Sequence, residues 1–131
     1  MSVSPQMPQR VLIVEDDFLN RMLFSAVLAE RGFVVEEVPD ERQALSAAEK
    51  FNPDLIIMDI QLPHISGVDL IAALKADARF SAIPVLAVTG YVGKGEERRI
   101  RDAGAEDYLP KPVSIEPFVT AVKRLLSAPV T

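Results

Sequence analysis

Leu55-Ile56-Ile57-Met58-Asp59 is the most informative segment of this 131-residue chain for its fold. Four consecutive apolar residues predict a strand that is covered on both faces, as a central strand of a parallel sheet is. The run ends at an acidic residue. Asn52-Pro53 separates it from the segment before, and Ser66-Gly67 precedes a helix that contains Val68, Ile71, Ala72 and Leu74.

Two further strand-helix units precede this stretch. Val11 to Val14 and Val34 to Val38 are short runs rich in β-branched residues, which favours strands. Gly32 marks the end of the first helix, because a left-handed residue is least costly at glycine. Pro39-Asp40 opens the second helix. Residues at helical spacing are Phe18, Met22, Leu23, Val27 and Leu28 in the first helix, and those expected to face inward in the second are Ala44, Leu45 and Ala48.

Two more units follow it. A strand from Pro84 to Val88 ends at Thr89, and a brief strand near Tyr108 and Leu109 ends at Pro110-Lys111-Pro112. The helix between them ends at Gly104, and Ser114 is expected to cap the last helix, which carries Phe118, Val122, Leu125 and Leu126. Because parallel strands need right-handed crossovers, five such units predict an α/β, doubly wound parallel sheet of order 2-1-3-4-5 with helices on both faces.

The composition narrows the classes of protein and of site. Without cysteine, disulfides and thiolate sites are excluded, and with one histidine a zinc site would be mostly carboxylate, which is uncommon. A formal net charge of −5 argues against nucleic acid as a direct partner. No signal peptide is recognisable and the apolar runs are too short to span a bilayer, so we expect a cytoplasmic protein without a membrane partner. We expect one domain at 10–127, a flexible tail at 1–9 and a short tail at 128–131.

Charged and hydroxyl side chains follow the strands at the point where each strand ends. In a doubly wound sheet these carboxyl ends form the working edge, so we expect the following residues to converge there: Glu15, Asp16, Asp59, Thr89 and Lys111. Three carboxylates in one place repel one another, and a single lysine cannot neutralise them. A hard divalent ion with oxygen ligands can, and Mg²⁺, with Mn²⁺ as the alternative, also takes a phosphate oxygen.

This arrangement predicts phosphoryl transfer onto a carboxylate. Asp59 would attack phosphorus. Asp16, supported by Glu15, would hold the metal ion. Lys111 and the Thr89 hydroxyl would bind the oxygens of the moving phosphoryl group. The sequence therefore contains a nucleophile, a metal site and an oxygen-binding pair at one edge of the sheet.

Four motifs, in this order and at these strand ends, resemble those of the response-regulator receiver family. They are Val14-Glu15-Asp16-Asp17, Met58-Asp59-Ile60-Gln61-Leu62-Pro63-His64-Ile65-Ser66-Gly67, Val88-Thr89-Gly90 and Tyr108-Leu109-Pro110-Lys111-Pro112. The resemblance covers nearly the whole chain and is strongest to single-domain members. It implies the CheY-like, flavodoxin-like fold. It also implies a switch that catalyses its own phosphorylation and dephosphorylation, rather than a conventional metabolic enzyme.

The resemblance also implies roles for individual residues. Asp59 is the implied phosphoacceptor, and the implied metal ligands are Glu15, Asp16, Asp59 and the backbone carbonyl of Gln61. Thr89 and Tyr108 are the implied switch pair, in which the threonine moves toward the phosphoryl group and the ring turns inward behind it. The peptide between Lys111 and Pro112 is expected to be cis. Glu41 stands where glycine is frequent in the family, and we expect this difference to affect only a turn.

The partners follow from the same resemblance. A histidine kinase, a histidine phosphotransfer protein, or both would donate the phosphoryl group. A downstream protein target would read the face made by the fourth helix, the fifth strand and the fifth helix. The likeness to single-domain members implies a role in cell-cycle or developmental control.

Other interpretations stay open at this point. The chain could be a receiver fragment of a hybrid histidine kinase, or a receiver fold used as a scaffold without phosphorylation. A flavodoxin-like FMN carrier has the same strand order, but Glu15-Asp16-Asp17 would repel the FMN phosphate. Tyr108 could be a core tyrosine with its hydroxyl at the surface. We interpret Asp17 as a helix N-cap rather than a ligand, and His64 as an exposed loop residue.

Overall fold

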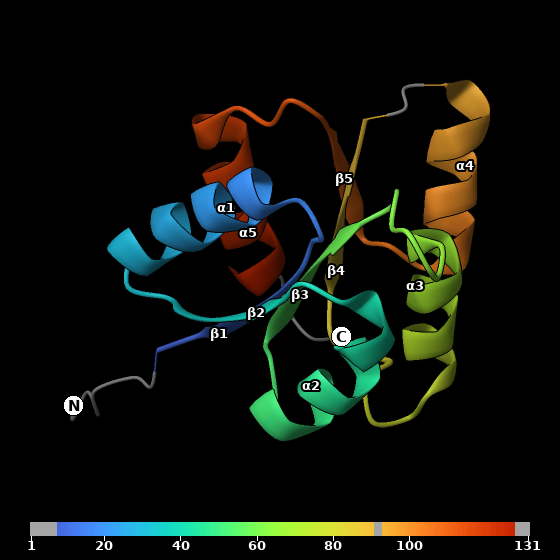
Figure 1. Ribbon diagram of the computed structural model, residues 1–131, viewed down its shortest axis with the longest axis horizontal. Coiled ribbons are helices and arrows are strands. Elements are labelled where there is room, and N and C mark those ends of the chain that lie inside the picture. Colours follow the sequence, from blue (N-terminus) through green and yellow to red (C-terminus); the bar gives the residue numbers. More distant parts are fainter. Residues whose placement is uncertain (1–7, 91–92, 128–131) are drawn as a thin grey trace.

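The computed structural model describes residues 8–90 and 93–127, and this part of the chain forms a five-stranded parallel sheet (Figure 1). Its strands are β1 (Arg10–Val14), β2 (Val34–Val38), β3 (Leu55–Asp59), β4 (Val85–Thr89) and β5 (Asp107–Pro110). They lie in the order β2-β1-β3-β4-β5, and every neighbouring pair is parallel. The predicted α/β doubly wound fold is therefore confirmed. The tails predicted at 1–9 and 128–131 lie outside the described residues, apart from residues 8 and 9.

Helices connect the strands and cover both faces of the sheet. They are α1 (Phe18–Glu30), α2 (Ala44–Phe51), α3 (Gly67–Ala76), α4 (Lys94–Ala103) and α5 (Ile115–Ser127), with a 3₁₀ turn at Glu41–Gln43 before α2. Figure 1 shows α1 and α5 on one face and α2, α3 and α4 on the other. None of the helices among the described residues has the length and apolar character needed to cross a membrane.

Local sequence signals set where these helices begin and end. The Asp17 side chain accepts a hydrogen bond from the Asn20 backbone N–H, and the Ser66 side chain accepts one from the Val68 backbone N–H, so both residues act as N-caps. Gly32 (φ +90°) and Gly104 (φ +116°) follow α1 and α4 in a left-handed conformation that side chains rarely adopt. The prediction of Asp17 as a cap is confirmed.

The core consists of two apolar layers, one on each face of the sheet. All residues of β3 and β4 are buried, which explains why the central stretch of sequence is apolar without alternation. Between the sheet and the α1–α5 pair, the rings of Phe24 and Phe118 stack with centroids 4.9 Å apart. The opposite layer contains Met58, Ile71 and Ile100, among others. Both faces of the sheet are therefore covered by packed side chains.

Leu45 does not face inward, and that prediction is wrong. The residue is 37% exposed, whereas Ala44 and Ala48 are buried and Phe51 packs against the core. One residue turns an α-helix by about 100°, so a buried stripe through positions 44, 48 and 51 leaves position 45 at its edge. Hydrophobicity alone did not determine the rotation of this short helix.

Candidate functional site

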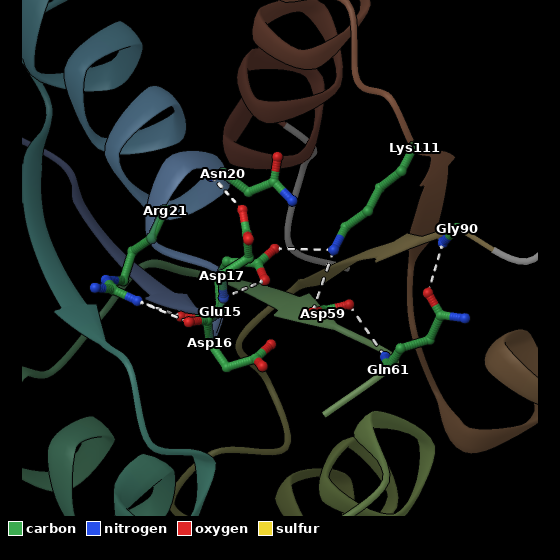
Figure 2. A network of polar contacts seen from close by, with 9 residues as sticks. All are labelled: Glu15, Asp16, Asp17, Asn20, Arg21, Asp59, Gln61, Gly90 and Lys111. Carbon is green, nitrogen blue, oxygen red and sulfur yellow. Dashed lines mark hydrogen bonds and ion pairs between the residues drawn. The ribbon is translucent and has the colours of Figure 1, made fainter. Parts of the chain in front are cut away.

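The polar residues at the carboxyl ends of the strands meet at one edge of the sheet (Figure 2). Glu15 and Asp16 follow β1, Asp59 ends β3 and Thr89 ends β4. Lys111 follows β5, and the peptide bond between it and Pro112 is cis. Chain order reverses at β1 and β3, which is where ligands bind in doubly wound sheets. The topology thus brings together residues that are up to 96 positions apart (15 to 111) in the sequence.

The three carboxylates lie close together at this edge. One oxygen of each, from Glu15, Asp16 and Asp59, lies within 4.8 Å of the others. Glu15 is 1% exposed and Asp59 2% exposed, whereas Asp16 faces solvent. Burial, together with the neighbouring Asp59, raises the pKa of Glu15 to about 7, and the same two causes raise the pKa of Asp16. The fold therefore holds carboxyl groups in a place where their ionised form is poorly solvated.

Lys111 is a cation that contacts two of these carboxylates. Its Nζ atom lies 3.2 Å from Oε1 of Glu15 and 3.2 Å from Oδ2 of Asp59. Burial opposes the charged ammonium, but the carboxylates of Asp59 and Glu15 outweigh it and raise the pKa of Lys111. The lysine therefore remains protonated and offsets only part of the negative charge.

The donor set fits a hard divalent cation. Oε1 of Glu15 is buried and accepts no hydrogen bond from the described residues, although Lys111 is near. A buried acceptor without a hydrogen bond is costly, and an all-oxygen cluster with surplus negative charge is what Mg²⁺ binds in proteins. Glu15, Asp16 and Asp59 are thus the residues that could hold a metal ion.

The loop after β3 is tied to the site by Gln61. Its backbone N–H donates to Oδ1 of Asp59 at 3.0 Å, and its side-chain Oε1 accepts from the Gly90 N–H at 3.2 Å (Figure 2). Gln61 therefore joins the ends of β3 and β4. The sequence prediction named only its backbone carbonyl and missed both of these contacts. The bond to Gly90, 29 residues away, leaves no local pattern because it is made by a side chain that bridges two loops, whereas the bond to Asp59 is local.

Gly67 lets this loop fold back on its own strand. A Cβ atom at this position would lie 2.3 Å from the carbonyl oxygen of Asp59 and 2.6 Å from Cα of Ile60. The Gly67 N–H donates to the Ile60 carbonyl at 3.0 Å, which closes the loop. The close approach explains why glycine begins α3.

Thr89 and Tyr108 lie on the same face of the sheet. Ala87 pairs with Tyr108 in the register of β4 and β5. Since residues two apart on a strand point to the same face, Thr89 lies on the same face as Ala87 and Tyr108. Thr89 is buried, and Tyr108 is partly buried against the layer formed with α2, α3 and α4. The Tyr108 hydroxyl donates to Oε1 of Glu97 on α4 at 3.0 Å. The sequence prediction did not name Glu97, because an acidic residue in the first turn of a helix is ordinary.

Glu41 does more than alter a turn, which was the only effect expected of it. Its side chain is 1% exposed, and Oε2 accepts hydrogen bonds from the backbone N–H groups of His64 and, at 2.8 Å, of Ile65. These bonds lower the pKa of Glu41 despite the opposing effect of burial. His64 itself is exposed, as predicted. Glu41 therefore anchors the loop that follows Asp59.

Comparisons with known proteins agree with this geometry. Residues 11–123 match the family model described as the response regulator receiver domain. The chain is 42% identical over 120 residues to the polar-differentiation response regulator DivK of Brucella anthropi, which covers 92% of this chain and 98% of that relative.

Solved structures of similar proteins share the fold. The chemotaxis protein CheY4 of Vibrio cholerae superposes with a TM-score of 0.86 at 28% identity, over 91% of this chain and 99% of that one. The receiver domain of a sensor histidine kinase from Pseudomonas aeruginosa superposes with a TM-score of 0.85 at 30% identity, over 93% and 100% of the two chains. That structure has a magnesium ion coordinated in its active site cleft.

Proposed function

Since this chain belongs to the response regulator receiver domain family of two-component signalling, as its motifs predicted, we propose that it is a single-domain switch phosphorylated on Asp59. The observation that carries the proposal is the position of the Lys111 ammonium, 3.2 Å from the Asp59 carboxylate and 3.2 Å from the buried Glu15. The Asp59 carboxylate lies at the open edge of the sheet, where it can act as a nucleophile. The Lys111 ammonium beside it would offset the negative charge of the phosphoryl group that Asp59 then carries.

The transfer step uses groups of this chain at stated atoms. A carboxylate oxygen of Asp59 attacks the phosphorus of a phosphohistidine, the P–O bond forms as the P–N bond breaks, and the imidazole nitrogen keeps the electron pair. Lys111 and the Thr89 hydroxyl bind phosphoryl oxygens as charge moves onto them. Hydrolysis of the acyl phosphate later restores Asp59.

The metal ligands in this proposal are Glu15, Asp16, Asp59 and the backbone carbonyl of Gln61. Mg²⁺, or Mn²⁺ in its place, would neutralise the carboxylates and bind an oxygen of the phosphoryl group. The surplus of carboxylates over the single lysine that contacts them supports this assignment, as does the buried Oε1 of Glu15, which faces Lys111 but accepts no hydrogen bond from the described residues.

The partners in this proposal are proteins. A histidine kinase or a histidine phosphotransfer protein supplies the phosphoryl group in the cytoplasm, and a target protein reads the surface of α4, β5 and α5. Exposed arginines on α4, Arg98, Arg99 and Arg101, contribute positive charge to that surface. The likeness to DivK over nearly its whole length favours the single-domain regulator over a kinase fragment, and favours a role in polar differentiation.

The test is phosphorylation of the purified chain with Mg²⁺ and a small-molecule phosphoryl donor, followed by intact mass spectrometry. We expect one phosphoryl group on the parent protein and none on Asp59→Asn. Asp69→Asn, which changes an exposed carboxylate on α3, is the matched control and should be modified like the parent. A parent protein that neither gains the phosphoryl mass nor responds to BeF₃⁻ would contradict the proposal.

A further inference from the structure

The hydroxyl of Tyr108 is bonded to a neighbouring helix. It donates to Oε1 of Glu97 on α4 at 3.0 Å, across the gap between α4 and β5. Phenol hydroxyls of partly buried tyrosines usually find such an acceptor, and a charged acceptor gives a stronger hydrogen bond than a neutral one. The contact fixes where the ring points.

Arg101 completes a closed set of contacts around this ring. Its Nε lies 3.1 Å from Oε2 of Glu97, and its guanidinium carbon lies 5.3 Å from the centroid of the Tyr108 ring. Its Nη2 lies 3.7 Å from Oδ1 of Asp107, the residue before the tyrosine. Glu97 is thus bonded to both the hydroxyl and the arginine, while the arginine covers the ring face.

The two partners of the hydrogen bond also shift each other's ionisation. The bond to Glu97 raises the pKa of Tyr108, and the bond from Tyr108, followed by Arg101, lowers the pKa of Glu97. A proton shared between a neutral phenol and an ionised carboxylate accounts for both directions.

We propose that Glu97 is a positioning residue that holds Tyr108 toward α4 in the unphosphorylated protein, so that phosphorylation must break the Tyr108–Glu97 hydrogen bond. The inference rests on the proposed function and on the switch pair that the family resemblance implies, in which the Tyr108 ring turns toward Thr89 after Asp59 is phosphorylated. Thr89 and Tyr108 share the face of the sheet that α4 covers (Figure 1), and the Tyr108 hydroxyl is bonded to Glu97 on that helix. A ring that turns inward toward Thr89 carries its hydroxyl away from this carboxylate.

The consequence is a bias against the active state before phosphorylation. When a ligand binds only a minor conformation of a protein, its apparent affinity is lower in proportion to the population of that conformation. Removing Glu97 should raise this fraction. An analogue of the phosphoryl group should then bind more tightly, although no contact with the analogue itself has changed.

The first measurement is the affinity of the full chain for BeF₃⁻ in the presence of Mg²⁺. We expect Glu97→Ala to tighten binding by about fivefold, and Glu97→Gln, which keeps a neutral acceptor, to tighten it less. Glu96→Ala is the matched control, because Glu96 precedes Glu97 on α4 but pairs with Arg99 instead of the tyrosine. Glu96→Ala should bind BeF₃⁻ with the same affinity as the parent.

The second measurement follows the ionisation of Tyr108 by NMR of the ¹³C-labelled ring. Tyr91→Phe leaves Tyr108 as the sole tyrosine of the chain. In this background Glu97→Ala should lower the pKa of Tyr108 toward its ordinary value, and Glu96→Ala should leave it unchanged. This readout does not depend on phosphorylation.

The outcomes separate the two proposals. If the parent binds BeF₃⁻ and Glu97→Ala binds it equally or more weakly, or if Glu96→Ala gains as much as Glu97→Ala, the positioning role is wrong while the phosphorylation switch stands. A parent that binds no BeF₃⁻ contradicts the switch and the positioning role together, even where the NMR titration finds the hydrogen bond. Circular dichroism of each variant checks folding, and Glu97→Gln replaces Glu97→Ala if the latter unfolds.

Discussion

The ammonium of Lys111 lies 3.2 Å from Oδ2 of Asp59, although the strands that carry these residues, β5 and β3, are separated by β4. The lysine side chain therefore spans the end of a strand to reach the carboxylate. Because it also contacts Glu15, one cation offsets two buried acids. This shared pairing determines how the site should respond to substitution, pH and metal ions.

Lys111→Ala should slow phosphorylation and strengthen Mg²⁺ binding. The rate with a small-molecule donor should fall about hundredfold, because a preorganised charge partner of the phosphoryl oxygens is lost. The Mg²⁺ dissociation constant should fall, because a cation that competes for the same carboxylates is gone. Mass spectrometry gives the rate and calorimetry the affinity, with the exposed Lys123→Ala as control. Weaker Mg²⁺ binding in Lys111→Ala would show that the lysine does not compete with the ion.

The stability of the metal-free protein should fall as pH rises from about 4.5 to about 7. The pKa of Glu15 is raised from 4.5 to about 7 in the folded protein, so its protonated form stabilises the fold below this range and that contribution is lost through it. The loss is about 3 kcal/mol at most. The measurement compares urea unfolding of the parent and Glu15→Gln at several pH values.

The pH dependence specific to Glu15 is the difference between these two proteins. We expect the difference in unfolding free energy to change across this range and to be flat above pH 8. Mg²⁺ affinity of the parent should rise over the same range, because the ion binds the ionised carboxylate. A difference that does not vary with pH would mean that Glu15 titrates normally.

Gly67→Ala should destabilise the protein by about 1–3 kcal/mol, since the new methyl group would overlap backbone atoms of Asp59 and Ile60 that cannot move freely. Urea unfolding measures the change. Gly95→Ala is the matched control within another helix, because nothing lies within 4 Å of a Cβ atom there. It should be neutral or slightly stabilising. Equal effects at the two positions would argue against a steric role for Gly67.

Glu41→Gln should loosen the loop after β3 and destabilise the protein by about 1–2 kcal/mol, because the hydrogen bonds of His64 and Ile65 lose a charged acceptor. Amide hydrogen exchange should speed up at these two residues first. Glu30→Gln, at the exposed end of α1, is the control. Unchanged exchange at Ile65 would show that the carboxylate does not anchor the loop in solution.

The order of strands and helices, and the edge of the sheet where the site lies, could be predicted from local sequence patterns. Apolar runs, caps such as Asp17 and left-handed glycines such as Gly104 act through neighbouring residues, so they can be recognised locally. Parallel strands end at one edge, so topology alone brings Glu15, Asp16 and Asp59 together. For this reason the acidic cluster could be predicted without coordinates.

The side-chain contacts between different helices, strands and loops could be identified only from the folded structure. Glu41 bonds to a backbone group 24 residues away, and Tyr108 bonds to Glu97, 11 residues away on another element. Leu45 lies at the edge of its helix's buried stripe although its neighbour Ala44 is buried. Such contacts depend on how each helix is rotated about its axis and on which rotamers packing permits, and neither is encoded in a local pattern of residues.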